Sequence, residues 1–302
     1  MNPAIAVIII ILAMVTMLLI TGRILSGIMV NIRRQSLAEA RAWQEEHYDL
    51  SWYDAIERHT YTVESFDNYV LHVERIVNPV PSDKYVIISH GYSDNRFGDL
   101  KYAKTYLDLG YNLIVYDLRG HGENEPTICS YTVRERKDLR DLIKDTRKRY
   151  ENISVLGLHG ESLGGATSLA VLYYQPEVDF VVADCAFSDI ETVLMDGMKA
   201  GHVPMIFYKV GKAFCQMRTG LSFKDMRPID CLKGNKVPIL FIHGENDEYI
   251  PSFHSELMVP ETDGYKDLRL FPGAGHAESV LTDPERYSQC VKEFLEEVFK
   301  NN

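Results

Sequence analysis

The sequence predicts an α/β fold in which helices cover both faces of a mostly parallel central sheet. From about residue 60 onward, apolar strand-like runs alternate with amphipathic helical runs, and such alternation requires crossover connections between parallel strands. The later strand candidates are apolar throughout, as expected for strands that are buried on both faces. A Gly-x-Ser-x-Gly segment at residues 160–164 directly follows one of these strands, which places it between a strand and a helix.

The expected strands and helices follow one another along most of the chain. The strand candidates are residues 61–64, 69–75, 85–89, 113–116, 153–158, 180–183, 238–243 and 268–271. The helical candidates are residues 100–109, 134–150, 163–174, 253–258 and 284–299. A short turn at Asp67-Asn68 joins the first two strands, so we expect these two to form an antiparallel hairpin.

One region interrupts the alternation. Residues from about 188 to 228 contain no convincing strand and are rich in methionine and aromatic side chains. We interpret this region as a helical cap inserted over the catalytic face of the domain. Methionine adapts its shape to apolar partners, so these side chains either pack the cap onto the body or contact an apolar substrate.

The composition excludes several classes of partner. The chain of 302 residues carries a formal net charge of −11 at pH 7, which argues against nucleic acid, because its binding requires basic side chains. The five cysteines are widely spaced and contain no Cys-x-x-Cys, so neither a disulfide framework nor a zinc site is expected. We expect no metal and no cofactor.

The N-terminus predicts a membrane anchor. Residues 2–22 carry no charge, and this length suits a helix that crosses a bilayer. A cleaved signal peptide is disfavoured because no basic residue precedes the apolar run and no clear Ala-x-Ala site follows it. The basic residues that follow place the globular part in the cytoplasm, but N-terminal anchors also display hydrolases outside the cell, so the orientation stays open.

These features divide the chain into three parts. Residues 1–34 form the N-terminal transmembrane anchor and juxtamembrane segment. Residues 35–60 form a helical linker, which opens with a capping box at Ser36 and Glu39. Residues 61–302 form the catalytic domain, with the cap insertion at about 188–228.

Ser162 is the candidate nucleophile. It lies at the centre of the Gly-x-Ser-x-Gly segment, where a sharp turn would hold its hydroxyl above the sheet. Gly160 and Gly164 keep Cβ atoms out of the space in which strand and helix approach each other. A serine hydroxyl is a weak nucleophile at neutral pH, so it requires a base, and the base requires an orienting carboxylate.

Asp247 is the candidate acid. It follows the apolar run 239–242, and the carboxyl ends of parallel strands form the functional edge of such a sheet. Glu245 and Glu248 lie nearby, and Asp184 follows the preceding strand, so these three carboxylates are alternatives. Chain order and loop position favour Asp247.

His276 is the candidate base. It lies in a loop of small residues after the last strand, before the final helix. Of the remaining histidines, His90, His121, His159 and His243 each precede a glycine at a strand end or in a loop. We expect these four to form local hydrogen bonds and not a metal site, because no ligand-like pair on one helix accompanies them.

Two backbone N–H groups are the candidate oxyanion hole. The first belongs to Leu163, the residue after the nucleophile, at the N-terminus of the next helix. The second belongs to Tyr92 in the segment His90-Gly91-Tyr92, where Gly91 permits unusual backbone geometry.

Taken together, these motifs resemble those of the α/β-hydrolase superfamily from residue 61 to the C-terminus. In chain order they are His90-Gly91-Tyr92, the segment 116–122, Gly160-x-Ser162-x-Gly164, Gly244-x-x-Asp247 and Gly275-His276. Within the superfamily, the anchor and the segments 159–162 and 183–185 resemble bacterial membrane-anchored serine hydrolases of the YqkD type. The resemblance implies a Ser162–Asp247–His276 triad. Glu161 departs from the family pattern, because many members have histidine or another residue there.

The sequence therefore favours a serine hydrolase that cleaves a carboxylic ester through an acyl-enzyme. The methionine-rich insertion suggests a small-molecule substrate with an apolar moiety. A thioesterase, peptidase or acyltransferase would use the same three residues, so the triad alone does not separate these activities. The alternative from another class is a non-catalytic binding protein on this fold, although such proteins usually lose a member of the triad.

Overall fold

The computed structural model describes residues 2–300 and contains two compact units. The N-terminal unit comprises the chain up to Asn31 together with Glu191–Asp225, and the sheet unit comprises Ile32–Ile190 together with Met226 onward.

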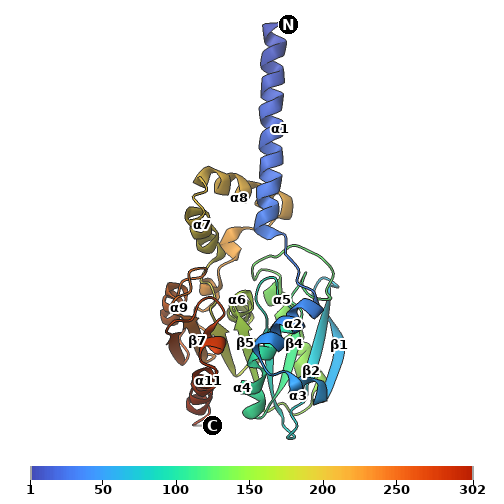
Figure 1. Ribbon diagram of the computed structural model, residues 1–302, viewed down its shortest axis with the longest axis vertical. Helices are drawn as coiled ribbons and strands as arrows, with labels where there is room; N and C mark the ends of the chain where they lie inside the picture. Colours follow the sequence, from blue (N-terminus) through green and yellow to red (C-terminus); the bar gives the residue numbers. More distant parts are fainter. Residues whose placement is uncertain (1, 301–302) are drawn as a thin grey trace. The chain divides into compact units, whose positions relative to one another are not determined.

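An eight-stranded sheet forms the centre of the sheet unit, with the strand order β1-β2-β4-β3-β5-β6-β7-β8 (Figure 1). The strands are β1 (Arg58–Glu64), β2 (Val70–Ile76), β3 (Lys84–Ser89), β4 (Tyr111–Tyr116), β5 (Val155–Glu161), β6 (Phe180–Asp184), β7 (Ile239–Gly244) and β8 (Lys266–Phe271). Strand β2 is antiparallel to both of its neighbours, β1 and β4, whereas β4 and the strands beyond it pair in parallel. The prediction of a mostly parallel sheet with an antiparallel hairpin at its start is confirmed.

Helices and short 3₁₀ turns connect the strands. The helices of the sheet unit are α2 (Leu37–His47), α3 (Ser51–Ala55), α4 (Ala103–Asp108), α5 (Glu135–Arg149), α6 (Leu163–Ala170), α9 (Phe253–Met258), α10 (Ser279–Thr282) and α11 (Pro284–Val298). The 3₁₀ turns are η1 (Gly98–Tyr102), η2 (Val171–Tyr174), η4 (Pro228–Cys231) and η5 (Val259–Glu261).

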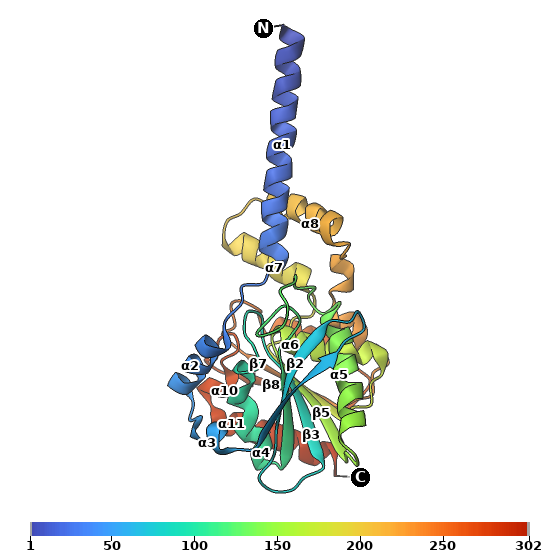
Figure 2. The same cartoon turned by 90° about the vertical axis from the view of Figure 1, so that its right-hand side faces the viewer.

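Both faces of the sheet are covered, as its apolar strands require. On one face, Tyr106 of α4 and Phe294 of α11 join the inward side chains Val86, Val182 and Leu240 in one apolar cluster. Figure 2 shows α4 and α11 on this side of the sheet and α5 on the other. Burying large apolar side chains on both faces fixes the register of the central strands and therefore the positions of their carboxyl ends.

The N-terminal unit is helical. It contains α1 (Pro3–Val30), α7 (Ile190–Ala200), α8 (Met205–Thr219) and the 3₁₀ turn η3 (Phe223–Asp225). The first residue of α7, Ile190, is the last residue of the preceding segment of the sheet unit. Helix α1 is long and apolar enough to cross a membrane, by length and composition, and it is the one such helix within residues 2–300.

The C-terminal end of α1 packs on α8. A Cβ atom at Gly22 would overlap the ring of Phe214, and a Cβ atom at Gly211 would lie 2.9 Å from Met29 Cε. The Arg218 guanidinium donates hydrogen bonds to Ser26 Oγ at 3.3 Å and to the Oδ1 oxygen of the residue that caps α1 at 3.0 Å. Glycine on each helix therefore permits a close approach that any larger residue would prevent.

Candidate active site

Ser162 lies at a strained turn between β5 and α6. Its backbone has φ of 53° and ψ of −113°, a conformation that costs free energy in any residue with a Cβ atom. A Cβ atom at Gly160 would overlap the backbone of Gly164, and one at Gly164 would overlap the backbone of Ser89. The two glycines therefore allow the tight strand-to-helix turn that presents the Ser162 hydroxyl, which is the geometry expected of a nucleophile elbow.

The structure brings His276 and Asp247 to this serine. The distance from His276 Nε2 to Ser162 Oγ is 3.0 Å, and that from His276 Nδ1 to Asp247 Oδ2 is 2.7 Å. A carboxylate can only accept, so Nδ1–H donates to Asp247, and Nε2 is left to accept the Ser162 hydroxyl proton. The three residues come from the carboxyl ends of β5, β7 and β8.

Asp247 is held as an ionised acceptor. Its Oδ1 accepts the backbone N–H groups of Tyr249 at 3.0 Å and Ile250 at 2.7 Å. Burial disfavours its charged form, but hydrogen bonds from His243 and His276 outweigh burial and hold the pKa of Asp247 well below its ordinary value. A negative charge at this point fixes the tautomer of His276.

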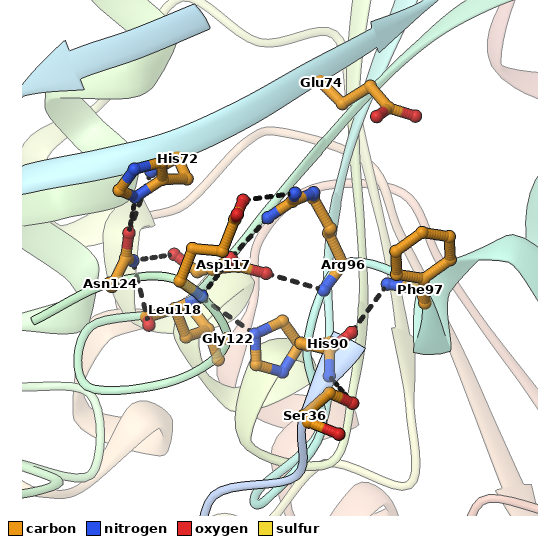
Figure 3. Close-up of polar contacts among 12 residues, drawn as sticks. Ser36, His72, Glu74, His90, Arg96, Phe97, Asp117, Leu118, Gly122 and Asn124 are labelled. Carbon is orange, nitrogen blue, oxygen red and sulfur yellow. Dashed lines mark hydrogen bonds and ion pairs between the residues drawn. The ribbon is translucent and has the colours of Figure 1, made fainter. Parts of the chain in front are cut away.

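The loop after β3 lies against the nucleophile. A Cβ atom at Gly91 would lie 3.7 Å from Ser162 Cβ and 2.9 Å from Glu161 Oε1. His90 fixes this loop, because its Nδ1–H donates to the Gly91 carbonyl at 2.8 Å. Its Nε2 accepts the Leu118 N–H, also at 2.8 Å (Figure 3). Burial lowers the pKa of His90 to about 4, so the ring stays neutral and keeps this acceptor.

Asp117 and Arg96 tie the loops after β3 and β4 together (Figure 3). Asp117 accepts the Arg96 backbone N–H at 2.9 Å and pairs with its guanidinium at 2.6 Å. Asn124 donates to the Asp117 carbonyl at 2.6 Å and accepts the His72 N–H at 2.8 Å, which extends the network to β2. The segment 116–122 therefore supports the candidate oxyanion loop and provides no reacting group.

A buried ion pair lies beside the nucleophile. Glu161, the residue before Ser162, pairs with Lys101, whose side chain is only 6% exposed. Tyr102 Oη donates to Glu161 Oε2 at 2.6 Å and lies 3.3 Å from Asp184 Oδ2. Burial and the nearby Glu161 charge raise the pKa of Asp184 to about 6. Asp184 supports the elbow by accepting the Ser162 N–H at its backbone carbonyl, 2.8 Å away.

The alternatives considered for the acid lie elsewhere. Glu245 and Glu248 are exposed, and Asp184 contacts Tyr102 and Ser279. Cys185 lies near the candidate triad, because its sulfur, one Asp247 oxygen and one His276 nitrogen all fall within 4.8 Å of one another. This is the one group in the described part of the chain that could hold a metal ion. Two of these three residues, Asp247 and His276, already form a hydrogen bond with each other.

The other histidines form local hydrogen bonds. His121 Nδ1 lies 2.9 Å from the Arg119 carbonyl, and His159 Nδ1 lies 2.8 Å from Tyr106 Oη. His243 contacts Ser255 Oγ at 2.7 Å and faces Asp247.

Known proteins share this architecture. A family model described as serine aminopeptidase, S33, matches residues 80–219. The Pyrococcus furiosus esterase Pf2001 superimposes with a TM-score of 0.68 over 82% of this chain and 94% of its own, at 24% sequence identity. YqkD of Bacillus subtilis is 27% identical over 292 residues, which are 94% of this chain and 95% of YqkD.

The chain has the α/β-hydrolase fold, and its sequence resembles members of that superfamily over most of its length. It also resembles YNL320W, a membrane protein of Saccharomyces cerevisiae, at 24% identity over 63% of this chain and 62% of that protein. The family-model match and the esterase-like fold together support a hydrolase.

The sequence does not indicate two features of this site. The first feature is the ion pair of Lys101 with Glu161, 60 positions away. Lys101 lies in the predicted helix 100–109, where a lysine normally faces solvent, and the sequence does not indicate the pairing. Asp94 lies in the loop after β3 and faces the same buried charges. The many polar residues between positions 93 and 101 were the available signal, but polar loops are common.

Proposed function

We propose that the chain is a serine hydrolase that cleaves a carboxylic ester through Ser162, His276 and Asp247. The observation that carries the proposal is the hydrogen-bonded chain from Ser162 Oγ to His276 and on to Asp247. Attack of Ser162 on the ester carbonyl passes its proton to His276 Nε2, which returns it to the leaving alcohol. Water, activated by the same histidine, then releases the acyl group.

We propose that the backbone N–H groups of Tyr92 and Leu163 bind the oxyanion that forms at the carbonyl. Leu163 is the first residue of α6, and the first N–H groups of a helix have no partner within the helix. The contact of Gly91 with Ser162 supports the placement of the loop that carries Tyr92. Two donors aimed at this oxygen would lower the barrier to reaction, because they stabilise the negative charge that develops there in the transition state.

Active-site labelling tests the proposal. A fluorophosphonate probe should label the wild-type protein, and Ser162→Ala should abolish labelling. Ser168→Ala is the matched control, because Ser168 is a buried serine of α6 that lies outside the proposed triad. A wild-type protein that is folded but unlabelled would instead support a binding protein on this fold.

The substrate bond is tested by matched esters, thioesters and anilides with one acyl group. We expect the ester to react fastest, although the name of the matching family, serine aminopeptidase, makes the anilide an informative competitor. A p-nitrophenyl ester series of increasing acyl length tests the apolar moiety proposed from the methionine-rich insertion. A preference for acetate would contradict that part of the proposal.

We also propose that α1 is a retained membrane anchor and that the insertion at about residues 188–228 forms the cap. Helix α1 has 28 residues and spans about 42 Å, more than the bilayer core of about 30 Å. Its C-terminal end is the part that packs on α8, through Gly22 and Gly211. This packing supports retention, because cleavage of α1 as a signal peptide would remove the partner of α8. The yeast relative is itself called a membrane protein.

Membrane fractionation tests the anchor. The full chain should remain in the membrane pellet after an alkaline carbonate wash, and its mass should include residues 2–22. Recovery of a soluble chain that begins after α1 would show that the segment is a cleaved signal peptide.

A further inference from the structure

A small pocket in the sheet unit opens beside His276. Its volume is about 270 Å³, just below the range of about 300–1,000 Å³ that is usual for pockets that take whole ligands. Helix α2 forms one wall with Trp43 and Gln44, and Asp94, Lys101 and Glu278 contribute the charged groups. The pocket therefore has room for one functional group of a substrate, next to the residue that must protonate the leaving group.

Two carboxylates and one buried amide are among the polar side chains that line this pocket, those of Asp94, Glu278 and Gln44. Gln44 is 1% exposed, and among the described residues its Oε1 oxygen has no hydrogen-bond partner, although its amide nitrogen lies 3.4 Å from the Gly98 carbonyl. The one lysine of the lining, Lys101, already contacts Glu161 and the Ala277 carbonyl. A buried acceptor without a donor costs free energy, so a donor supplied by a ligand would stabilise it.

Negative charge exceeds positive charge around the pocket. Glu161, Lys101 and Asp117 are the charged groups that face Asp94, and burial together with the Glu161 charge raises the pKa of Asp94 to about 6. The same causes, with Asp94 itself, raise the pKa of Asp99 well above its ordinary value. Lys101 pairs with Glu161 and Arg96 pairs with Asp117, and no ion pair among residues 2–300 involves Asp94, so a cation next to Asp94 would be stabilised.

Asp94 is positioned by the chain around it. A Cβ atom at Gly98 would overlap the Asp94 carboxylate, so glycine at this position leaves the space that the carboxylate fills. Trp43, which lines the pocket, stacks on His47 but is still 39% exposed, and an exposed indole ring attracts cations.

We propose that this pocket binds a protonated amine of the substrate, whose N–H donates to Gln44 Oε1 and whose charge lies next to the Asp94 carboxylate. The inference rests on the proposed function, because it assigns to that site a substrate class: esters whose alcohol carries an ammonium group with at least one N–H. An acidic lining, an unpartnered buried acceptor and an exposed indole all match such a group.

The test compares two esters of the same acid. We use 2-(dimethylamino)ethyl butyrate, protonated at neutral pH, and its uncharged isostere 3-methylbutyl butyrate, and we follow acid release by titration. The full-length protein in detergent should show a kcat/KM at least tenfold higher for the amino ester. Asp94→Asn and Gln44→Met should each bring the ratio of the two kcat/KM values to within about twofold.

Two further variants separate charge from position. Gly98→Ala keeps every charge but displaces the Asp94 carboxylate, so it should also lower the ratio. Glu46→Gln removes an exposed carboxylate of the same helix that does not line the pocket, so the ratio should not change. Thermal unfolding of each variant shows whether it is folded. In the wild type, the ratio should fall as the pH drops below about 6, because Asp94 takes up a proton.

Binding distinguishes a failure of this inference from a failure of the proposed function. Calorimetry on Ser162→Ala should show that 2-(dimethylamino)ethanol binds and that 3-methyl-1-butanol does not, and Asp94→Asn should abolish the binding. Hydrolysis of both esters at equal rates would overturn the inference and leave the esterase proposal intact. Amine binding without hydrolysis of either ester would overturn the esterase proposal and leave the assignment of the pocket to an ammonium group intact. Equal binding of 1,3-propanediol and the amine would assign the pocket to hydroxyl groups and overturn the ammonium proposal.

Discussion

At the scale of single residues, the buried carboxylates of the site differ in the pH at which they lose their charge. Asp247 receives four donors, from two histidines and two backbone N–H groups, so ionisation is favoured although the side chain is buried. Burial raises the pKa of Asp94 and that of Asp184 to about 6. Hydrogen-bond donors, and not the depth of burial, therefore decide which of these carboxyls keeps its charge at low pH.

The lowered pKa of Asp247 predicts a pH-dependent contribution to stability. This contribution is fully present above the ordinary pKa of an aspartate, about 3.9, and is lost as the pH falls through the lower pKa of the folded state. Asp247→Asn should therefore lower the free energy of unfolding at pH 7 by on the order of 2 kcal/mol, and by less at pH 3.5. Urea unfolding at the two pH values measures the difference.

Glu245→Gln is the control for this prediction, because Glu245 lies in the same loop but is exposed. Its effect on unfolding should be within about 0.5 kcal/mol at either pH. An Asp247→Asn penalty that stays constant from pH 7 to pH 3.5 would show that the loss is structural and unrelated to ionisation.

At the scale of elements, apolar strands were predictable and polar ends were not. Strand β5 was expected to end at residue 158, but it continues to Glu161 because its last residues pair with β6 up to Asp184. Strand β1 begins at Arg58, three residues before the expected start, and its polar first residues pair only with β2. Pairing with a neighbour decides such ends, and the local sequence does not contain that information.

The insertion was expected to be helical, and α7 and α8 confirm this. Its packing on α1 was not predicted, because the contact depends on two glycines almost 190 positions apart, Gly22 and Gly211. Within a helical sequence pattern, a glycine by itself indicates only a lower helix propensity.

Close packing of α1 and α8 predicts opposite effects for two similar substitutions. Gly211→Ala places a Cβ atom 2.9 Å from Met29 and 3.0 Å from Leu25, so it should destabilise α8 by about 1–3 kcal/mol. Gly197→Ala in α7 meets nothing within 4 Å and should stabilise its helix by about 0.5–1 kcal/mol. Hydrogen exchange of the full chain in detergent measures both, and equal effects of the two variants would argue against a close contact between α1 and α8.

At the scale of the whole molecule, the candidate site could be predicted because its parts follow strand ends. Ser162, Asp247 and His276 each lie just beyond a strand, and the sheet topology brings these ends to one edge. Their catalytic roles remain predictions. The pocket between α2 and the loop after β3 could not be predicted in this way, because Gln44 and Asp94 depend on how a linker helix packs.

The two compact units differ in how much apolar surface each buries, and this difference predicts stepwise unfolding. Most of the buried large side chains lie in the sheet unit, whereas residues 191–225 contribute only a few, among them Tyr208 and Phe223. Segments with few buried contacts open at a lower free energy. Amides of α7 and α8 should therefore exchange with solvent at urea concentrations at which those of β3, β5 and β7 stay protected. Fluorophosphonate labelling of Ser162 should persist under the same conditions, because the elbow belongs to the sheet unit. Mass spectrometry of exchange and labelling on one sample measures both, and simultaneous loss of protection in the two units would show that they unfold as a single cooperative body.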